Sequence, residues 1–267
     1  MMRINYDGFT IMGIEIPFYG ILGVFGFLSS LLMLLIICKK SKCSFNDAIY
    51  VYVTGFLGLI TGAKLLYIIV NLPQMIDDVY LIKNHFDIWV SKYIQSGMVY
   101  YGGMIGCFLV IIMTKNKFPY SVDRYIPLLI PCYILFSLFG RLGCLLTGCC
   151  YGKESHGRFS VIYHNSMIAP NDMKLIPIQL YEVIFDLIII IIFLCILFYT
   201  QKGELLLSFY LGGYAIYRFI SEFYRGDVER GYIFFLSISQ WISIIILFFD
   251  FLTIIKQKEN LKKIFVE

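Results

Sequence analysis

This sequence has few charged residues: Asp, Glu, Lys and Arg make up 15% of its 267 residues, against roughly a quarter in soluble domains. Hydrophobic residues make up 59%, aromatic residues 18%, and the mean hydropathy is +0.78. A soluble fold of this length could not bury so much apolar surface, so lipid must solvate most of it. The composition excludes a disordered chain, a collagen-like fibre and a disulfide-rich secreted module.

Signals typical of other membrane and exported proteins are also missing. Apolar runs such as LIIIIIFLCILFY do not alternate as barrel strands do, and no internal repeat supports an inverted-repeat transporter. The first apolar run is too long for a signal-peptide core and lacks a small-residue cleavage site, so we expect it to remain as a span. The weak net charge of +4 gives no reason to expect nucleic acid as a partner.

Seven apolar stretches are long enough to cross roughly 30 Å of hydrocarbon as helices. The predicted fold class is an all-α integral membrane protein, with seven transmembrane helices in a single domain over 1–267. We expect these spans at about 17–38, 48–70, 96–113, 125–146, 178–199, 205–224 and 233–255. The polar connection 147–177 is expected to form a small extracytoplasmic cap. Lys and Arg are concentrated after the first, third and fifth spans and in the tail, which places the N-terminus outside and the C-terminus in the cytoplasm.

Charged side chains within the expected spans indicate candidate sites, because each costs about 2.5–3.5 kcal/mol at a helix centre. Arg218 and Glu222 are spaced i and i+4, so they share a helix face and can form an ion pair. For Lys64 and Asp250 a structural explanation is favoured, because Lys64 can extend to the interface and Asp250 lies near a helix end. Asp186 fits local pairing and a functional role equally well.

Arg141 is the sharpest candidate, within FGRLGCLLTGCCYG at 139–152. Its neighbouring glycines allow a ligand to approach closely, and its planar guanidinium offers paired hydrogen bonds to a phosphate. Helix packing is the alternative. A second glycine-rich segment, SGMVYYGGMIG at 96–106, could place Tyr100 and Tyr101 beside a headgroup, or could consist of interfacial tyrosines and packing glycines.

Cys144, Cys149 and Cys150 form a cluster at the end of the fourth expected span. A disulfide is permitted outside the cytoplasm, a zinc site could add His156 and His164, and a thiolate near Arg141 could act as a nucleophile. The spacing matches no standard zinc motif, so no metal is predicted, and the cysteines are retained as a possible thiol site.

Six motifs along most of the chain resemble those of the prolipoprotein diacylglyceryl transferase family. In order, they are FYG at 18–20, TGAKLLY at 61–67, SGMVYYGGMIG at 96–106, FGRLGCLLTGCCYG at 139–152, PIQLYE at 177–182 and YRFISEFYRGD at 217–227. In TGAKLLY, Lys64 is present where the family has an arginine. The signature residues depart from the family pattern at three positions: Tyr101 replaces a histidine, Cys144 an asparagine and Cys149 a glutamate.

The resemblance implies a transferase of the bacterial plasma (inner) membrane that acts in lipoprotein biosynthesis. It would move the diacylglyceryl group of phosphatidylglycerol to a lipobox cysteine thiol of a prolipoprotein, within the lipid bilayer and without a cofactor. The implied catalytic residues are Arg141, Arg218, Glu222, Tyr101 and Tyr19. The implied substrate-binding residues are Arg141, Gly102, Gly103, Gly143, Gln179, Tyr181 and Glu182.

The three departures leave two alternatives open. One is a divergent member of the family that acts on another phospholipid or another acceptor, with a cysteine taking part in the reaction. The other is a non-catalytic protein that binds or transports lipid through the same anionic-headgroup site.

Overall fold

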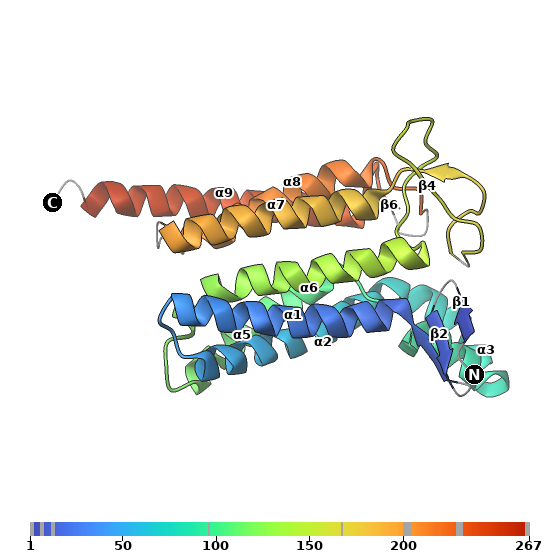
Figure 1. Ribbon diagram of the computed structural model, residues 1–267, viewed down its shortest axis with the longest axis horizontal. Coiled ribbons are helices and arrows are strands. Elements are labelled where there is room, and N and C mark those ends of the chain that lie inside the picture. Colours follow the sequence, from blue (N-terminus) through green and yellow to red (C-terminus); the bar gives the residue numbers. More distant parts are fainter. Residues whose placement is uncertain are drawn as a thin grey trace. The chain divides into compact units, whose positions relative to one another are not determined.

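Long helices form most of the chain (Figure 1). The structure, a computed structural model, describes residues 3–5, 8–11, 14–95, 97–166, 168–199, 204–227 and 232–264. Contacts along the chain group it into two units, one of Met1–Cys43 with Ile126–Glu267 and the other of Ser44–Tyr125.

The first unit is built on long, strongly apolar helices. They are α1 (Phe18–Lys40), α6 (Ile126–Thr147), α7 (Ile178–Tyr199), α8 (Glu204–Glu222) and α9 (Ile238–Ile264). Helix α1 packs along α6, α6 along α7, and α8 along α9. Because backbone groups in lipid must be satisfied within a segment, helices are the natural form for such sequences.

Short antiparallel strands lie before α1 and in the connections between the later helices of this unit. Strands β1 (Arg3–Asn5), β2 (Gly8–Ile11) and β3 (Ile14–Pro17) precede α1, β4 (Val161–Ile162) pairs with β5 (Lys174–Leu175), and β6 (Tyr232–Ile233) pairs with β7 (Leu236–Ser237). The connection from α6 to α7 and that from α8 to α9 lie at the same end of their helices (Figure 1). Residues that follow α6 can therefore meet residues that follow α8.

A capping box starts α9 and fixes how the chain enters it. The Gln240 backbone N–H donates to the Ser237 hydroxyl at 3.2 Å, and the Ser237 N–H donates to the Gln240 side-chain oxygen at 3.0 Å. Both residues are buried. This reciprocal arrangement satisfies two donors that the first turn of a helix leaves unpaired.

The second unit pairs α2 (Phe45–Asp77) with α5 (Tyr100–Thr114). Between them lie α3 (Val79–Asn84), α4 (Phe86–Val90) and the π-helical turn η1 (Ser91–Gln95); η2 (Lys115–Lys117) and η3 (Val122–Arg124) follow α5. Glycines at i and i+4 on both helices, Gly58 and Gly62 against Gly102 and Gly106, bring the two backbones into contact. Such small-residue spacing is a common means of close helix packing in membranes.

Helix α5 begins later than the sequence predicted. Gly97 has a φ of +72°, and its backbone lies against the ring of Tyr67. The Val99 N–H donates to the Ala63 carbonyl of α2 at 3.1 Å, so this segment is held outside the helix, which starts at Tyr100. The expected span 96–113 thus corresponds to a helix of 15 residues.

Five helices of the described residues are long and apolar enough to cross a membrane: α1, α2, α6, α7 and the Ile238–Ile255 part of α9. The chain is therefore an all-α membrane protein of several spans, as predicted. Helix α8 occupies the position of the sixth expected span, and α5 that of the third. The count of seven spans stays a prediction.

Candidate functional site

A buried ion pair joins α6 to α7. The Arg141 Nη2 atom lies 2.8 Å from Glu182 Oε1, and the two side chains are 11% and 1% exposed. The Tyr214 hydroxyl of α8 donates to the same Glu182 oxygen at 3.3 Å. Three helices thus converge on one carboxylate. Because a buried charge needs close compensation, Arg141 and Glu182 depend on each other.

A second buried ion pair lies near the end of α8. Arg218 Nη2 is 2.9 Å from Glu222 Oε2, and each side chain is 5% exposed. This confirms the pair predicted from the i, i+4 spacing. Arg218 Nη2 also donates to the Ser239 hydroxyl in the first turn of α9 at 3.3 Å. The other terminal nitrogen, Nη1, is buried without a hydrogen-bond partner among the described residues.

A third arginine, Arg225, follows α8 and pairs with Asp227. Its Nε and Nη2 donate to the two carboxylate oxygens at 2.9 and 2.7 Å, and the guanidinium is buried. Burial alone would lower the pKa of Arg225, but Cys150 and Asp227 raise it above its ordinary value. Its Nη1 is likewise buried without a partner in the part of the chain that the structure describes.

Backbone hydrogen bonds attach the end of α6 to the end of α8. The Lys153 N–H donates to the Tyr224 carbonyl at 2.8 Å, and the Gly226 N–H donates to the Tyr151 carbonyl at 3.0 Å. A Cβ on Gly226 would lie 2.5 Å from the Gly152 carbonyl oxygen, so glycine is needed there. This pairing brings Arg225 within electrostatic range of Cys150.

The sulfur atoms of Cys144, Cys149 and Cys150 all lie within 4.8 Å of one another, without a disulfide among them in the described structure. Cys150 has a φ of +62°, in the left-handed region. The Thr147 hydroxyl donates to the Cys149 sulfur at 3.4 Å. Burial beside this cluster raises the pKa of Tyr163 to about 12.

Neither histidine considered for a zinc site belongs to this cluster. His164 Nδ1 lies 2.8 Å from Asp172 Oδ1, with both side chains exposed, and His156 is exposed as well. The cluster therefore consists of sulfur atoms alone among the described residues.

Comparison with known proteins decides the family. Residues 8–256 match the model of the prolipoprotein diacylglyceryl transferase family. A phosphatidylglycerol–prolipoprotein diacylglyceryl transferase of Clostridium tetani is 34% identical over 88% of this chain and 91% of its own length. Phosphatidylglycerol–prolipoprotein diacylglyceryl transferase 2 of Clostridium perfringens is 36% identical over 76% of this chain and 74% of its own length. A protein of the same name from Campylobacter hominis is 28% identical over 94% of this chain and 90% of its own length.

The chain belongs to the prolipoprotein diacylglyceryl transferase family. The resemblance drawn from six motifs is thereby confirmed, and with it a multi-pass protein of the bacterial inner membrane.

Within this family member, the predicted residues of α1 and α7 have distinct surroundings. Tyr19 lies against Gly143, where an added Cβ would be 2.8 Å from the tyrosine ring. Gln179 is buried, and its Nε2 donates to the Cys149 carbonyl at 2.7 Å, so it supports the cysteine turn. Tyr181 is 40% exposed, whereas Glu182 beside it is fully buried, so the two face different surroundings.

Tyr101, Gly102 and Gly103 belong to the second unit, where all three are buried on α5. A Cβ on Gly102 would lie 2.5 Å from the Gly62 carbonyl oxygen, which gives this glycine a packing role in the structure. Lys64 donates from Nζ to the Gly97 carbonyl at 3.4 Å and lies over the Tyr67 ring, 4.8 Å from its centre. A contact to substrate by these residues stays a prediction.

Three residues near the charged pairs were not selected from the sequence as site residues. Tyr214 donates a hydrogen bond to Glu182, and Arg225 lies within electrostatic range of Cys150. Tyr217 stacks on Phe185 at 4.4 Å, and its buried hydroxyl lacks a hydrogen-bond partner among the described residues. Tyr217 and Arg225 stand inside the YRFISEFYRGD motif, so the motif could have indicated them.

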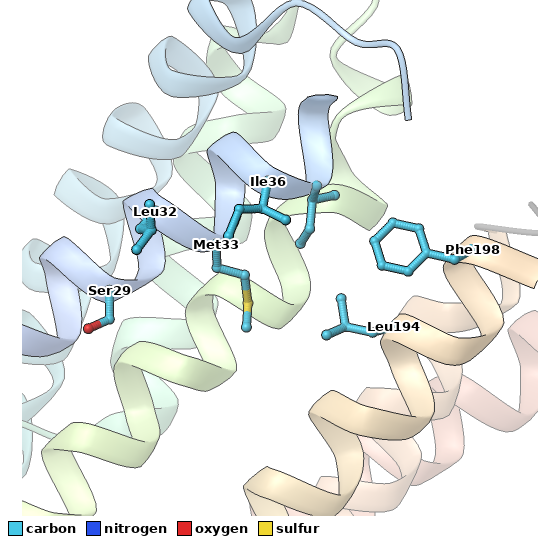
Figure 2. A pocket seen from close by; sticks show the side chains of 7 residues that line it. Ser29, Leu32, Met33, Ile36, Leu194 and Phe198 are labelled. Carbon is cyan, nitrogen blue, oxygen red and sulfur yellow. The ribbon is translucent and has the colours of Figure 1, made fainter. Parts of the chain in front are cut away.

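An apolar groove lies between α1 and α7, toward the opposite end from Arg141 and Glu182. It has a volume of about 250 Å³ and is lined by Ser29, Leu32, Met33, Ile36, Ile37, Leu194 and Phe198. Figure 2 shows side chains of both helices facing this space. At 1.5 Å per residue, Leu194 lies about 18 Å along α7 from Glu182.

Proposed function

We propose that this chain transfers the diacylglyceryl group of phosphatidylglycerol to the thiol of a lipobox cysteine in a prolipoprotein. The relatives carry the name of this reaction. The observation that carries the proposal is the buried guanidinium of Arg218, whose Nη1 has no partner among the described residues. A buried donor of this kind favours an anionic ligand, because leaving it unsatisfied costs free energy.

The reaction is a displacement at a saturated carbon with a phosphate as leaving group. The acceptor thiol gives up its proton to solvent, its sulfur forms a bond to the glycerol carbon, the carbon–oxygen bond breaks, and glycerol 1-phosphate departs with the electron pair. Charge accumulates on the departing phosphate, so fixed guanidinium groups accelerate the step by stabilising that charge in a dry site. Arg141 and Arg218 would supply this stabilisation, while Glu182 and Glu222 hold their guanidinium groups in place.

The position of the charges along the helices suits an amphiphilic substrate. Arg141 lies near the end of α6, Glu182 near the start of α7, and Arg218 near the end of α8. The apolar groove lies farther along α7. A lipid could place its phosphate at the arginines and an acyl chain along the helices toward the groove, so that both of its parts are matched.

The finer arrangement in the membrane is part of the same proposal. Seven spans in one domain would place the N-terminus outside and the C-terminus in the cytoplasm. The connection 147–177 would then form an extracytoplasmic cap beside the arginines. This orientation would put the site on the side where an exported prolipoprotein arrives.

A divergent acceptor is the second candidate, favoured by the cysteines at 144 and 149. The test uses purified protein in nanodiscs of phosphatidylglycerol, with a synthetic lipobox peptide read by mass spectrometry. We expect a diacylglyceryl mass gain that Arg141→Ala and Arg218→Ala reduce by about 10²–10³-fold, as expected for loss of a charge-stabilising donor.

The exposed Arg124 of η3 provides a matched control, since Arg124→Ala removes the same group from a residue that belongs to the other unit of the chain. Glu222→Ala should reduce the rate less than Arg218→Ala, because it removes only the orienting partner. Full activity of folded Arg141→Ala would overturn the phosphate assignment. Lipid modification of a different thiol, with the lipobox peptide unmodified, would establish the second candidate.

A further inference from the structure

We propose that Cys144, Cys149 and Cys150 bind a zinc ion whose fourth coordination position receives the acceptor thiol. The first part rests on the geometry of this chain alone. The second part, the acceptor, rests on the proposed function.

The three sulfurs are already close to the spacing that zinc requires. They lie within 4.8 Å of one another. With zinc–sulfur bonds of about 2.3 Å, sulfurs on a tetrahedral ion are about 3.8 Å apart. Small side-chain rotations would therefore bring the three thiolates onto one ion.

The backbone is shaped so that the sulfurs converge. Gly148 and Cys150 both have positive φ, +76° and +62°. This conformation suits glycine but costs a residue with a Cβ about 1–2 kcal/mol. The turn folds the chain back so that Cys149 and Cys150 meet Cys144 on the last turns of α6. Strain at a residue other than glycine persists where the surrounding structure enforces it, and such positions are concentrated at functional sites.

Neighbouring groups hold this turn in place. Gln179 donates to the Cys149 carbonyl at 2.7 Å, and the Ser166 hydroxyl, which donates to the Thr147 carbonyl at 3.1 Å, lies against Gly148. The Gly152 N–H donates to the Ile176 carbonyl at 3.1 Å. The cluster is thus anchored from α7 and from the connection that follows the turn, which favours a preformed metal site.

Two arginines lie near the cluster. Arg141 lies one turn before Cys144 on α6, and both Arg141 and Arg225 are within electrostatic range of Cys150. Three thiolates and a divalent ion carry one net negative charge, which these guanidinium groups can balance. Glu182 pairs with Arg141, and Asp227 pairs with Arg225. Neither carboxylate belongs to the group of three sulfurs.

The ligand set selects the kind of metal and leaves a position open. Sulfur ligands favour zinc or cuprous copper over magnesium and calcium. Three protein ligands with a fourth position for water or substrate are typical of catalytic zinc, whereas structural zinc has four protein ligands. No fourth His, Cys, Asp or Glu joins the group among the described residues, so this arrangement corresponds to the catalytic kind.

An open zinc position would prepare the acceptor thiol for attack. A thiol that coordinates zinc loses its proton, so the S–H bond breaks, a zinc–sulfur bond forms and the proton passes to solvent. The bound sulfur then attacks the glycerol carbon as the phosphate leaves, with no change of oxidation state. A cysteine of the cluster acting as a covalent nucleophile would instead form a stable thioether that a second displacement must break.

The test uses the full chain in nanodiscs and begins with the unmodified protein. Zinc content is measured by mass spectrometry of the metal, and Co²⁺ is added to metal-free protein as a spectroscopic probe of thiolate ligation. We expect about one zinc ion per chain and a sulfur-to-cobalt charge-transfer band. Addition of the lipobox peptide should change this spectrum, and a Cys→Ser lipobox peptide should not.

Cys149→Ser and Cys144→Ser should each weaken zinc binding at least tenfold, whereas Cys195→Ser, at an exposed position of α7, should not. Removal of zinc from the unmodified protein should abolish transfer, and zinc should restore it. A native mass showing a disulfide within the cluster, the absence of the cobalt band, or a preference for cuprous copper would overturn the zinc site.

The two parts of the proposal fail differently. Transfer that continues at full rate without metal would overturn activation of the acceptor by zinc and leave the proposed function intact. Zinc binding through the cysteines without transfer under any metal condition would uphold the metal site and overturn the proposed function.

Discussion

The ion pair of Arg141 and Glu182 provides a test that separates stability from function. Replacing only Arg141 by leucine leaves the Glu182 carboxylate buried without its guanidinium, one turn from Asp186 on the same face of α7. Replacing only Glu182 leaves a buried cation. Replacing both by leucine removes both charges together.

The expected magnitudes follow from burial. With the two side chains 11% and 1% exposed, removing one partner should lower the free energy of unfolding by about 3–5 kcal/mol. For a chain of this size that corresponds to a fall of about 6–20 °C in melting temperature. The double variant Arg141→Leu/Glu182→Leu should recover most of this loss, because a buried pair can often be replaced by apolar groups at little cost.

The assay measures the monodisperse fraction that remains after heating in detergent, together with transfer to the lipobox peptide. The stability of the double variant should exceed that of either single variant, while its transfer activity should stay as low as that of Arg141→Leu. Equal losses that simply add in the double variant would refute the pairing argument. Transfer activity that returns with stability would show that Arg141 acts on folding alone.

Three further changes test the packing of the chain. Gly102→Ala should destabilise the second unit by about 1–3 kcal/mol, since its Cβ would lie 2.5 Å from the Gly62 carbonyl oxygen. The control Gly23→Ala on α1, where the space around the glycine is open, should be neutral or stabilising. Equal melting temperatures of the two variants would contradict this packing. Ser237→Ala should cost about 0.5–2 kcal/mol through loss of the α9 cap, and Ser237→Thr should retain most of that stability. Cys150→Gly should stabilise metal-free protein by up to about 1 kcal/mol, because it relieves the left-handed backbone, while it weakens zinc binding; a lower melting temperature without metal would argue against strain.

Sequence patterns with short spacing could be interpreted correctly. The i, i+4 separation of Arg218 and Glu222 fixes their relative position on any helix, and the structure confirms their pairing. The long apolar runs likewise predict helices, because lipid leaves the backbone few alternatives. The start of α5 could not be obtained in this way, since it depends on Gly97 and on a contact between Val99 and Ala63 of another helix.

Contacts between distant segments were beyond the reach of the sequence. Arg141 and Glu182 were each selected as candidates, but their direct contact depends on how α6 and α7 pack. The burial of Arg225 depends on the backbone pairing of Gly226 with Tyr151, which joins connections that are far apart in the chain. The proximity of the Cys144, Cys149 and Cys150 sulfurs depends on a turn with a left-handed Cys150, which the spacing of the cysteines does not specify.

The proposed reaction also sets a geometric requirement for the nucleophile and the leaving group. In a displacement at carbon, the attacking sulfur and the departing oxygen must lie on opposite sides of the reacting atom, with the sulfur about 3–3.5 Å away before reaction. Helix α6 carries both Arg141, for the phosphate, and Cys144, for the zinc that would hold the sulfur, one turn apart. Hydrogen bonds from Lys153 and Gly226 tie the end of α8 to the same turn. One rigid scaffold would thus hold the nucleophile and the leaving group. Gln179→Ala removes the hydrogen bond to the Cys149 carbonyl and so loosens this turn. We expect this variant to lower the transfer rate more than it lowers lipid binding.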